Sequence, residues 1–574
     1  MNRTQISSII LSILFALCAN TAFSQSMGDV AAPFLCDNSP KREVRAVWLT
    51  TIGGLDWPHS YANGSRNSVE KQQRELTGIL DKLQQAGVNT VLLQARIRGT
   101  VIYPSKYEPW DGCLSGNPGV SPGYDALDFC IEECHKRGME LHAWVVTIPL
   151  GKWNGKGCAN MRKKYPSLVK RVGDEGYMNP ENAKTGELLA DICGEIAANY
   201  DVDGIHLDYI RYPETWKEKV SKDRGRKYIT DIVRKVSLTV KSKKPWVKLS
   251  CSPIGKYQDL PNQSSNGWNA YSRVMQDAQG WLQEGLMDML FPMMYFKGNN
   301  FYPFALDWSE NSCGRTIVPG LGIYFMSPKE KDWKLEVITQ EMEVLRQWGM
   351  GHAFFRNRFF TDNLKGIYRF TADVFDKNAA IAPAMTWESS VVPGAPTDIV
   401  CDTLNSTLSW SGAKDRSDGP YLTYNIYSSA EYPVDITKAC NLVATRRKET
   451  SLKVPFDGRF YAVTAMDRYG NESGAKQNCE RKSVMPVKRE NASFEVFLPM
   501  FACDGKTVSL GKTVANNSDL LQISTMQGTV VKTTFVNKAI DVRTLPEGFY
   551  LIRTLGKKNS SHRLGYFKLK RGGD

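Results

Sequence analysis

Residues 202–213 read VDGIHLDYIRYP, and this stretch predicts a buried strand that ends in ionisable side chains. Side chains alternate along a strand with a period of two, so Gly204, His206 and Asp208 share one face. An inward-facing histidine and carboxylate are costly unless that face opens on a polar cavity. A parallel barrel provides such a cavity at the C-terminal mouth of its strands, where active sites lie. The stretch therefore predicts that Asp208 reaches the mouth of a barrel.

The same kind of apolar run recurs from residue 41 to about residue 365, and amphipathic helical patterns separate the runs. The predicted strands are 44–50, 90–95, 140–146, 204–210, 247–253, 289–295, 317–324 and 351–355, and the helical patterns are 70–85, 126–136, 188–199, 227–240, 271–283 and 335–348. Strands that alternate with helices pair in parallel. Eight such units predict an α/β fold of the (β/α)8 type. An open doubly wound sheet is the alternative, but no Gly-rich nucleotide turn follows the first strand.

The 574 residues divide into four predicted segments. Residues 1–24 have a basic start, an apolar run and small residues at a cleavage site, which predicts a secretory signal peptide. Residues 25–385 hold the barrel. After the Pro-Gly-Ala-Pro linker at 393–396, short alternating runs predict a small all-β sandwich over 393–482 and a second one over 483–574.

These segments predict an exported protein that resides in the periplasm, on the outer membrane surface or outside the cell. No stretch after the signal peptide approaches the roughly 20 apolar residues of a transmembrane helix. The net charge is +13. Because no nucleic-acid-binding motif accompanies it, we interpret the charge as a solvated basic surface and expect no nucleic-acid partner. The oligomeric state is not predicted.

Several segments together resemble one known family. Residues 43–50 (EVRAVWLT), 103–110 (YPSKYEPW), 135–144 (HKRGMELHAW) and the 203–213 run occur in the order and spacing of the bacterial glycosyl hydrolase-like 10 family. The resemblance covers roughly residues 41–365. It implies a (β/α)8 barrel linked to glycan cleavage in cell envelopes, and family members are associated with peptidoglycan glycan strands stripped of stem peptides. Many relatives carry a second Asp where this chain has Tyr209.

Two weaker resemblances concern the C-terminal half. Residues 393–478 are similar to a fibronectin type III domain. Residues 545–553 (LPEGFYLIR) are similar to the end of a C-terminal sorting domain of the type IX secretion kind. Both imply small β domains that accompany the barrel.

Glycoside hydrolysis normally needs two carboxyl groups, one to protonate the leaving oxygen and one to act as nucleophile or base. Asp208 is the predicted acid/base, because partial burial at the mouth would raise its pKa. The structural alternative is an ion pair of Asp208 with Arg211 or Arg45. Asp203 precedes the same strand and is expected to have a turn or stability role at the closed end of the barrel.

The second carboxyl group is not identified by spacing. Five acidic residues could lie on loops near the mouth, namely Glu108, Asp111, Asp307, Glu310 and Glu341. An N-acetyl group of the substrate could also replace this carboxyl, as in substrate-assisted glycosidases.

Aromatic and polar side chains near the ends of several strands suit a sugar, whose rings have apolar faces and polar rims. Gln94 and Arg96 end the second strand on a shared face. His142 and Trp144 do the same on the third. The full set of predicted substrate-binding residues is Trp48, Gln94, Arg96, His142, Trp144, His206, Arg211, Tyr295 and Tyr324. Core packing is the alternative for each aromatic residue, and polar groups aimed into a pocket favour binding.

Other chemistries lack their motifs. His142, His206 and Asp208 could in principle bind Zn²⁺, but no histidine pair has the usual metal-binding spacing, so no metal site and no cofactor are predicted. A serine-hydrolase elbow and a P-loop are absent from the sequence. Two function classes remain: an exported glycosidase acting on an envelope or related amino-sugar polymer, and a glycan-binding barrel without catalysis that its β domains anchor.

Overall fold

The computed structural model describes residues 39–478, apart from residue 218 and residues 456–457, and five C-terminal segments: 501–510, 520–525, 530–535, 539–555 and 561–570. The predicted signal peptide lies outside the described residues. The chain divides into two compact units, the larger comprising residues 39–479 and the smaller containing the C-terminal residues from 480 onward. Among the helices described, none is both long and apolar enough to cross a bilayer.

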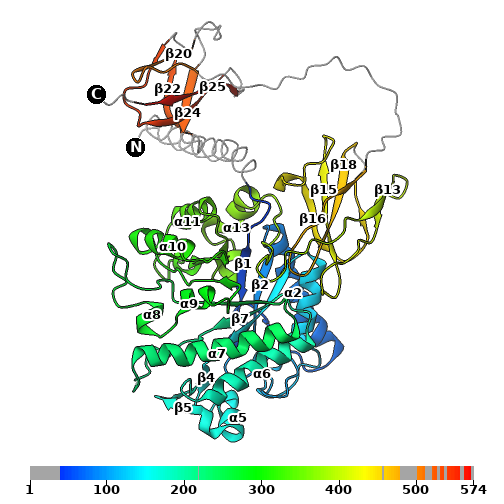
Figure 1. The fold of residues 1–574 in the computed structure, drawn as a ribbon, viewed down its shortest axis with the longest axis vertical. Coiled ribbons are helices and arrows are strands. Elements are labelled where there is room, and N and C mark those ends of the chain that lie inside the picture. The colour runs from blue at the N-terminus through cyan, green and yellow to red at the C-terminus, as the bar shows by residue number, and fades with distance from the viewer. Residues whose placement is uncertain are drawn as a thin grey trace, which may run out of the picture. The chain divides into compact units, whose positions relative to one another are not determined.

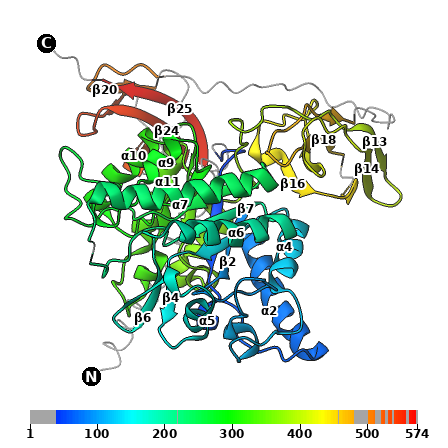
Figure 2. The same ribbon diagram turned by 60° about the horizontal axis from the view of Figure 1, so that its bottom comes forward.

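The larger unit is built around a parallel sheet whose strands all begin at one end of the barrel (Figures 1 and 2). In chain order the strands are β1 (Arg45–Leu49), β2 (Thr90–Arg96), β3 (Glu140–Val146), β7 (Gly204–Asp208), β8 (Lys248–Cys251), β9 (Met289–Leu290), β10 (Thr316–Ile317), β11 (Gly320–Leu321) and β12 (His352–Phe354). Each pairs in parallel with its neighbour.

The sheet closes through its seventh strand, which is interrupted into β10 and β11. The first half pairs with β9 and the second with β12. The Val318 N–H donates to the Leu290 carbonyl over 2.8 Å, and the Ala353 N–H donates to the Pro319 carbonyl over 3.0 Å. The segment thus bonds to both neighbours, and the ring is complete. The (β/α)8 prediction is confirmed, and the open-sheet alternative is excluded.

Helices cover the outside of the ring. They include α2 (Arg66–Gln85), α4 (Ala126–Lys136), α6 (Ala183–Asn199), α7 (Lys222–Lys243), α10 (Tyr302–Glu310) and α11 (Leu335–Gln347), and Figures 1 and 2 both show α6 and α7 side by side. Local signals explain their ends: at α4, the Asp125 carboxylate accepts hydrogen bonds from the N–H groups of Leu127 and Asp128. Such a cap satisfies donors that the helix itself leaves unpaired.

The predicted helix over 271–283 is wrong as a single element. The structure has α8 (Ala270–Arg273) and α9 (Ala278–Gln283) instead. Met275 between them has a φ of 53°, a left-handed conformation that a helix cannot continue through. Asp277 then caps α9 by accepting a hydrogen bond from the Gly280 N–H.

A sizeable insertion follows β3 on the C-terminal side of the barrel. It contains the antiparallel strands β4 (Pro149–Lys152), β5 (Val169–Val172) and β6 (Glu175–Met178), with α5 (Lys156–Lys164) between β4 and β5. The insertion places charged residues beside the loops that follow β1 and β2.

A small β domain completes the larger unit. Its two antiparallel sheets are β13 (Thr397–Asp402), β14 (Thr407–Ser411) and β17 (Ser451–Lys453), and β15 (Thr423–Ser429), β16 (Leu442–Arg447), β18 (Phe460–Met466) and β19 (Lys476–Gln477). Trp410, Ile426 and Val463 share a buried core between the sheets. The fibronectin type III likeness stays a prediction.

The C-terminal unit is also all-β in its described residues. It has one sheet of β21 (Leu520–Thr525), β22 (Val530–Phe535), β24 (Gly548–Leu555) and β25 (Ser561–Leu569), and a pair of β20 (Thr507–Ser509) and β23 (Ala539–Asp541). Val508, Ile523 and Ile552 belong to its apolar core. The sorting-domain likeness remains a prediction.

Candidate active site

Asp208 is the last residue of β7, so its carboxylate lies at the C-terminal mouth of the barrel, as predicted. Three donors converge on it. The Ser252 hydroxyl donates to Oδ1 over 2.8 Å, the Tyr209 backbone N–H donates to the same oxygen over 2.8 Å, and the Trp144 indole donates to Oδ2 over 3.1 Å. The residue is 7% exposed. The carboxylate is thus held in one orientation while keeping a small accessible surface.

Burial raises the pKa of Asp208, while the hydrogen bond from Ser252 and the charge of Arg211 oppose that rise. Neither arginine considered from the sequence pairs with it. Arg211 forms its ion pair with Glu214 at 2.5 Å. Arg45 pairs with Glu43 at 2.7 Å. Asp208 is thus buried without an ion pair to either arginine, and burial favours its protonated form.

Tyr209, directly after Asp208, is a site residue that the sequence analysis did not include. Its φ of 53° is uncommon for a bulky residue, and such strain concentrates at functional sites. The ring is half-buried at the mouth, where the Arg211 guanidinium lies 4.4 Å from its centroid. The sequence signal that could have identified Tyr209 is its position directly after Asp208, the carboxylate that ends β7.

Half-exposed aromatic rings surround this part of the mouth. The rings of Tyr295 and Tyr324, both predicted, lie 5.8 Å apart. Phe355 follows β12, and the centroid of its ring lies 5.3 Å from that of Tyr295 and 5.9 Å from that of Trp48. The sequence analysis did not predict Phe355 as a site residue. Burial raises the pKa of Tyr295, and the charges of Tyr324 and Asp208 add to that rise. The apolar faces of this cluster suit sugar rings.

His206 lies one layer below Asp208 in the barrel interior. Its Nδ1 is 3.0 Å from the Ser250 hydroxyl, and its Nε2 accepts a 3.4 Å hydrogen bond from the Trp48 indole. Burial and the neighbouring His142 lower the pKa of His206 well below its ordinary value. The imidazole is therefore neutral. His206 and Trp48 are both buried and support the mouth from beneath.

His142 lies deeper still, in the layer nearest the closed end. Its Nε2 is 3.2 Å from a carboxylate oxygen of Glu140, and its ring packs directly on Gly204. A Cβ at position 204 would lie 2.6 Å from Nδ1 of His142, so only glycine fits there. Trp144, two residues along β3, is the member of this predicted pair that reaches Asp208.

Gln94 and Arg96 do not share a set of partners. The Gln94 side chain accepts hydrogen bonds from the N–H groups of Thr51 and Ile52 at 3.1 and 2.9 Å and so fixes the loop after β1. A register shift between β2 and β3 follows Gln94. Arg96 is fully buried and forms a 2.6 Å ion pair with Glu108. The prediction that Gln94 and Arg96 share one face of the strand is wrong, because the register shift falls between them: Gln94 pairs with Trp144 and Arg96 with Val145. Their contact with substrate stays a prediction.

The candidates for a second carboxyl group lie apart from the mouth or are already engaged. Asp307 and Glu310 belong to α10 and Glu341 to α11, so the expectation that they lie on mouth loops is wrong. Glu108 is buried against Arg96, as described above. Asp111 caps the short helix α3 (Gly112–Ser115). Burial has the largest effect on the pKa of Asp208, followed by the Ser252 hydroxyl, the Arg211 charge, the Tyr209 N–H and the Trp144 indole.

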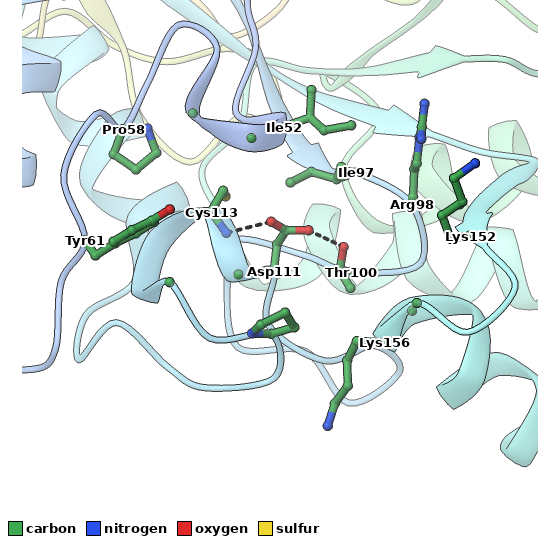
Figure 3. A pocket seen from close by; sticks show the side chains of 18 of the residues that line it. Ile52, Pro58, Tyr61, Ile97, Arg98, Thr100, Asp111, Cys113, Lys152 and Lys156 are labelled. Atoms are coloured by element: carbon green, nitrogen blue, oxygen red, sulfur yellow. Dashed lines mark hydrogen bonds between the residues drawn. The ribbon is translucent and has the colours of Figure 1, made fainter.

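A cavity of about 610 Å³ opens beside the mouth (Figure 3). We call it the loop cavity. It is formed by the loops after β1 and β2 and by the insertion after β3, and its lining includes Tyr61, Arg98, Asp111, Lys152 and Lys156. Apart from Asp111, a candidate for the second carboxyl group, none of its lining residues was predicted as a site residue, because they lie in loops without periodic pattern. Among the described residues, no group of three or more His, Cys, Asp or Glu side chains is arranged to hold a metal ion.

Comparison with known proteins agrees with this geometry. Residues 43–224 and 215–328 match the family model described as glycosyl hydrolase-like 10. The barrel domain belongs to the glycosyl hydrolase-like 10 family. The match ends inside the barrel and does not test the two β domains. Membership confirms the predicted family for the barrel and makes the chain a glycosyl hydrolase.

Curated relatives share this classification. The chain is 28% identical over 498 residues to "Glycosyl hydrolase YngK" of Bacillus subtilis, covering 78% of this chain and 95% of that protein. It is 29% identical over 324 residues to "Glycosyl hydrolase DigH" of Escherichia coli, covering 50% of this chain and 74% of that protein. Among solved structures, α-L-fucosidase isoenzyme 2 from Paenibacillus thiaminolyticus aligns at 14% identity with a TM-score of 0.40, covering 58% of this chain and 49% of that one. A likeness at that level supports no functional inference.

Proposed function

We propose that this glycosyl hydrolase cleaves an amino-sugar polymer of the bacterial envelope, such as peptidoglycan glycan strands, with Asp208 as the acid/base. The observation that carries the proposal is a carboxyl group of raised pKa at the barrel mouth, held by three donors and flanked by half-exposed aromatic rings. The substrate class comes from the resemblance of the chain to its family.

The donors around Asp208 suit a group that gives up a proton during the reaction. When protonated, Asp208 donates to the glycosidic oxygen as the bond to the anomeric carbon breaks. Ser252, Trp144 and the Tyr209 N–H then stabilise the carboxylate that forms. Burial favours the protonated form of Asp208, because the charged form is poorly solvated there.

None of the five acidic residues considered as the second carboxyl group is free on a mouth loop, and this favours a substrate-assisted route. In that route the acetamido oxygen of the sugar forms a bond to the anomeric carbon while the protonated glycosidic oxygen leaves. Water then attacks the same carbon, the acetamido bond breaks, and Asp208 takes the proton of the water. An N-acetylated substrate would itself supply the second group.

We also propose that the protein is exported. The proposal is supported by the N-terminal sequence, in which an apolar run follows a basic start. It would act in the periplasm, on the outer membrane surface or outside the cell, with the β domains holding the barrel near its polymer.

The proposal is tested by digesting peptidoglycan glycan strands, native and N-deacetylated, with the wild type and Asp208→Asn, and reading products by mass spectrometry. We expect products from the wild type on native strands and a loss of at least about a hundredfold in rate for Asp208→Asn. Undiminished cleavage by the variant would rule out Asp208 as the acid/base. Equal cleavage of N-deacetylated strands would rule out the substrate-assisted route.

A second candidate is a glycan-binding barrel with little or no turnover. The residue that favours it is Tyr209, which stands where many family members have a second Asp. Intact strands that nonetheless co-sediment with the wild type would support this candidate over the hydrolase.

A further inference from the structure

The insertion after β3 carries an excess of positive charge. Residues 149–178 contain seven lysine or arginine residues and two acidic ones. Asp174 forms an ion pair with Lys152 at 2.6 Å, and Glu175 accepts a 3.1 Å hydrogen bond from the Tyr177 hydroxyl. No acidic group of the insertion is therefore left to balance its other cations. Figures 1 and 2 both show α5, which carries several of them, near the lower edge of the larger unit.

Helix α5 presents three cations on one exposed face. Residues that are seven and eight positions apart lie on the same side of a helix, so Lys156, Lys163 and Lys164 share a face. All three are exposed. The buried residues of α5, which include Cys158 and Met161, face the rest of the insertion. The helix is thus anchored by its apolar side and turns its lysines to solvent.

A fourth lysine extends this face. The Lys164 ammonium donates to the backbone carbonyl of Lys106 at 3.5 Å, which places the exposed Lys106 beside α5. We call the four side chains the basic face: Lys106, Lys156, Lys163 and Lys164. Within the part of the chain that the structure describes, none of these four ammonium groups forms an ion pair.

Two guanidinium groups adjoin the basic face. Arg162, next to Lys163, and Arg171 of β5 both lie on the Trp153 ring, with their guanidinium carbons 4.2 and 5.3 Å from its centroid. Arg162 donates to the Trp153 carbonyl and Arg171 to the Gly173 carbonyl, both over 3.0 Å. These carbonyls hold the two cations in place without neutralising them. Like charges held together repel each other, and an anionic surface relieves that repulsion.

The arrangement of these cations indicates the kind of anionic partner. A single small anion is bound by donors that converge on one point. The cations of the basic face are instead spread out, because Lys156 and Lys163 are about two helical turns apart. Charges spread over an exposed face match a surface that carries many anionic groups, such as the phosphate-bearing headgroups of a bilayer.

We propose that the basic face is a docking surface for a bilayer that contains anionic phospholipids. The insertion follows β3 on the C-terminal side of the barrel, so docking would bring the barrel mouth near the membrane surface. This inference goes beyond the proposed function, because cleavage of soluble strands does not require a membrane. The membrane setting comes from the proposed export of the protein.

Binding of the full chain to vesicles tests the proposal. Co-sedimentation compares vesicles of pure phosphatidylcholine with vesicles that also contain about 30 mol% phosphatidylglycerol. We expect the wild type to bind the anionic vesicles at about 50 mM NaCl and to dissociate at about 500 mM, since salt screens the attraction. Each lysine near an anionic membrane strengthens binding about fivefold, so Lys163→Gln/Lys164→Gln should bind about 25-fold more weakly.

The control removes the same charge elsewhere. Lys414→Gln/Lys453→Gln changes two exposed lysines of the small β domain and should alter vesicle binding by less than about twofold. Both double variants should cleave soluble strands at the wild-type rate, since none of the four lysines belongs to the candidate active site. The vesicle assay does not depend on cleavage, so a failure of the proposed function would leave its result intact.

Equal binding of the wild type to both kinds of vesicle would overturn the proposal, and so would equal losses in the two double variants. A third outcome concerns a different partner. Binding to soluble polyphosphate that depends on Lys163 and Lys164, without binding to vesicles, would assign the basic face to a soluble polyanion and overturn the bilayer.

Discussion

At the scale of single residues, the chemistry of this protein depends on how one carboxylate is surrounded. Burial raises the pKa of Asp208, and the hydrogen bond from Ser252 is the largest of the effects that oppose this rise. The hydroxyl stabilises the charged form through its 2.8 Å hydrogen bond. Removing that donor must therefore move the pKa of Asp208 further up.

Ser252→Ala is expected to shift the pH dependence of the reaction. A general acid works when protonated, so kcat/KM should fall as pH rises through the raised pKa of Asp208. Without the Ser252 hydroxyl this descending limb should move to higher pH. Rates measured across pH 4–9 (about the usual range for such profiles) check the shift. Ser242→Ala, on the exposed side of α7, serves as the matched control, and an unmoved limb in Ser252→Ala would show that Asp208 is not the group being titrated.

At the scale of secondary-structure elements, β3 and β7 position the site because they lie side by side in register. His142 is paired with Gly204, Trp144 with His206 and Val146 with Asp208. The missing side chain at Gly204 admits the His142 ring, and this contact sets how closely the two strands approach. The orientation of Trp144 towards Asp208 follows from that approach.

Gly204→Ala is expected to lower the free energy of unfolding by about 1–3 kcal/mol, the usual cost of an overpacked core. Urea unfolding followed by tryptophan fluorescence measures it. Gly78→Ala is the matched control: this glycine lies inside α2 with no atom near its added Cβ. There alanine should raise the unfolding free energy by about 0.5–1 kcal/mol. Equal effects at both positions would contradict the close approach of β3 and β7.

At the scale of the larger unit, the small β domain neutralises buried charges at the closed end of the barrel. Arg446 forms ion pairs with Asp203 at 2.5 Å and with Glu140 at 3.0 Å. Arg468 approaches Asp203 at 3.2 Å, and Lys248 of the barrel pairs with Glu140 at 2.5 Å. Burial would raise the pKa of both carboxyl groups, but these cations hold both pKa values well below their ordinary range. The stability role predicted for Asp203 thus involves another domain.

Arg446→Met is expected to destabilise the larger unit by about 3–5 kcal/mol at pH 7, because it leaves buried carboxylates short of a partner. Carboxyl groups with a lower pKa in the folded state stabilise it above their unfolded pKa values, about 4, and this contribution disappears as pH falls through the folded values. The deficit of the variant should therefore shrink below about pH 4. Urea unfolding at several pH values measures it, with exposed Lys453→Met as control. A deficit that does not depend on pH would contradict this assignment.

Local periodicity was sufficient to predict the order of eight strands and the place of Asp208. Alternation along residues 204–208 assigns the inner face, and parallel strands bring their C-terminal ends to one mouth. The same reasoning failed for Arg96, because a register shift is set by the neighbouring strand. It also failed for the helix over 271–283, which Met275 interrupts with a left-handed backbone that its residue type does not signal.

The sequence by itself determined the barrel, its family and the carboxylate at its mouth, because each depends on patterns that repeat within a few residues. Only the tertiary structure decided what surrounds that carboxylate. Ser252 follows β8, Trp144 lies on β3 and Phe355 follows β12, while at the closed end of the barrel Arg446 of the small β domain reaches Asp203. Barrel closure brings these distant segments together, and no local pattern records which loop side chains will meet.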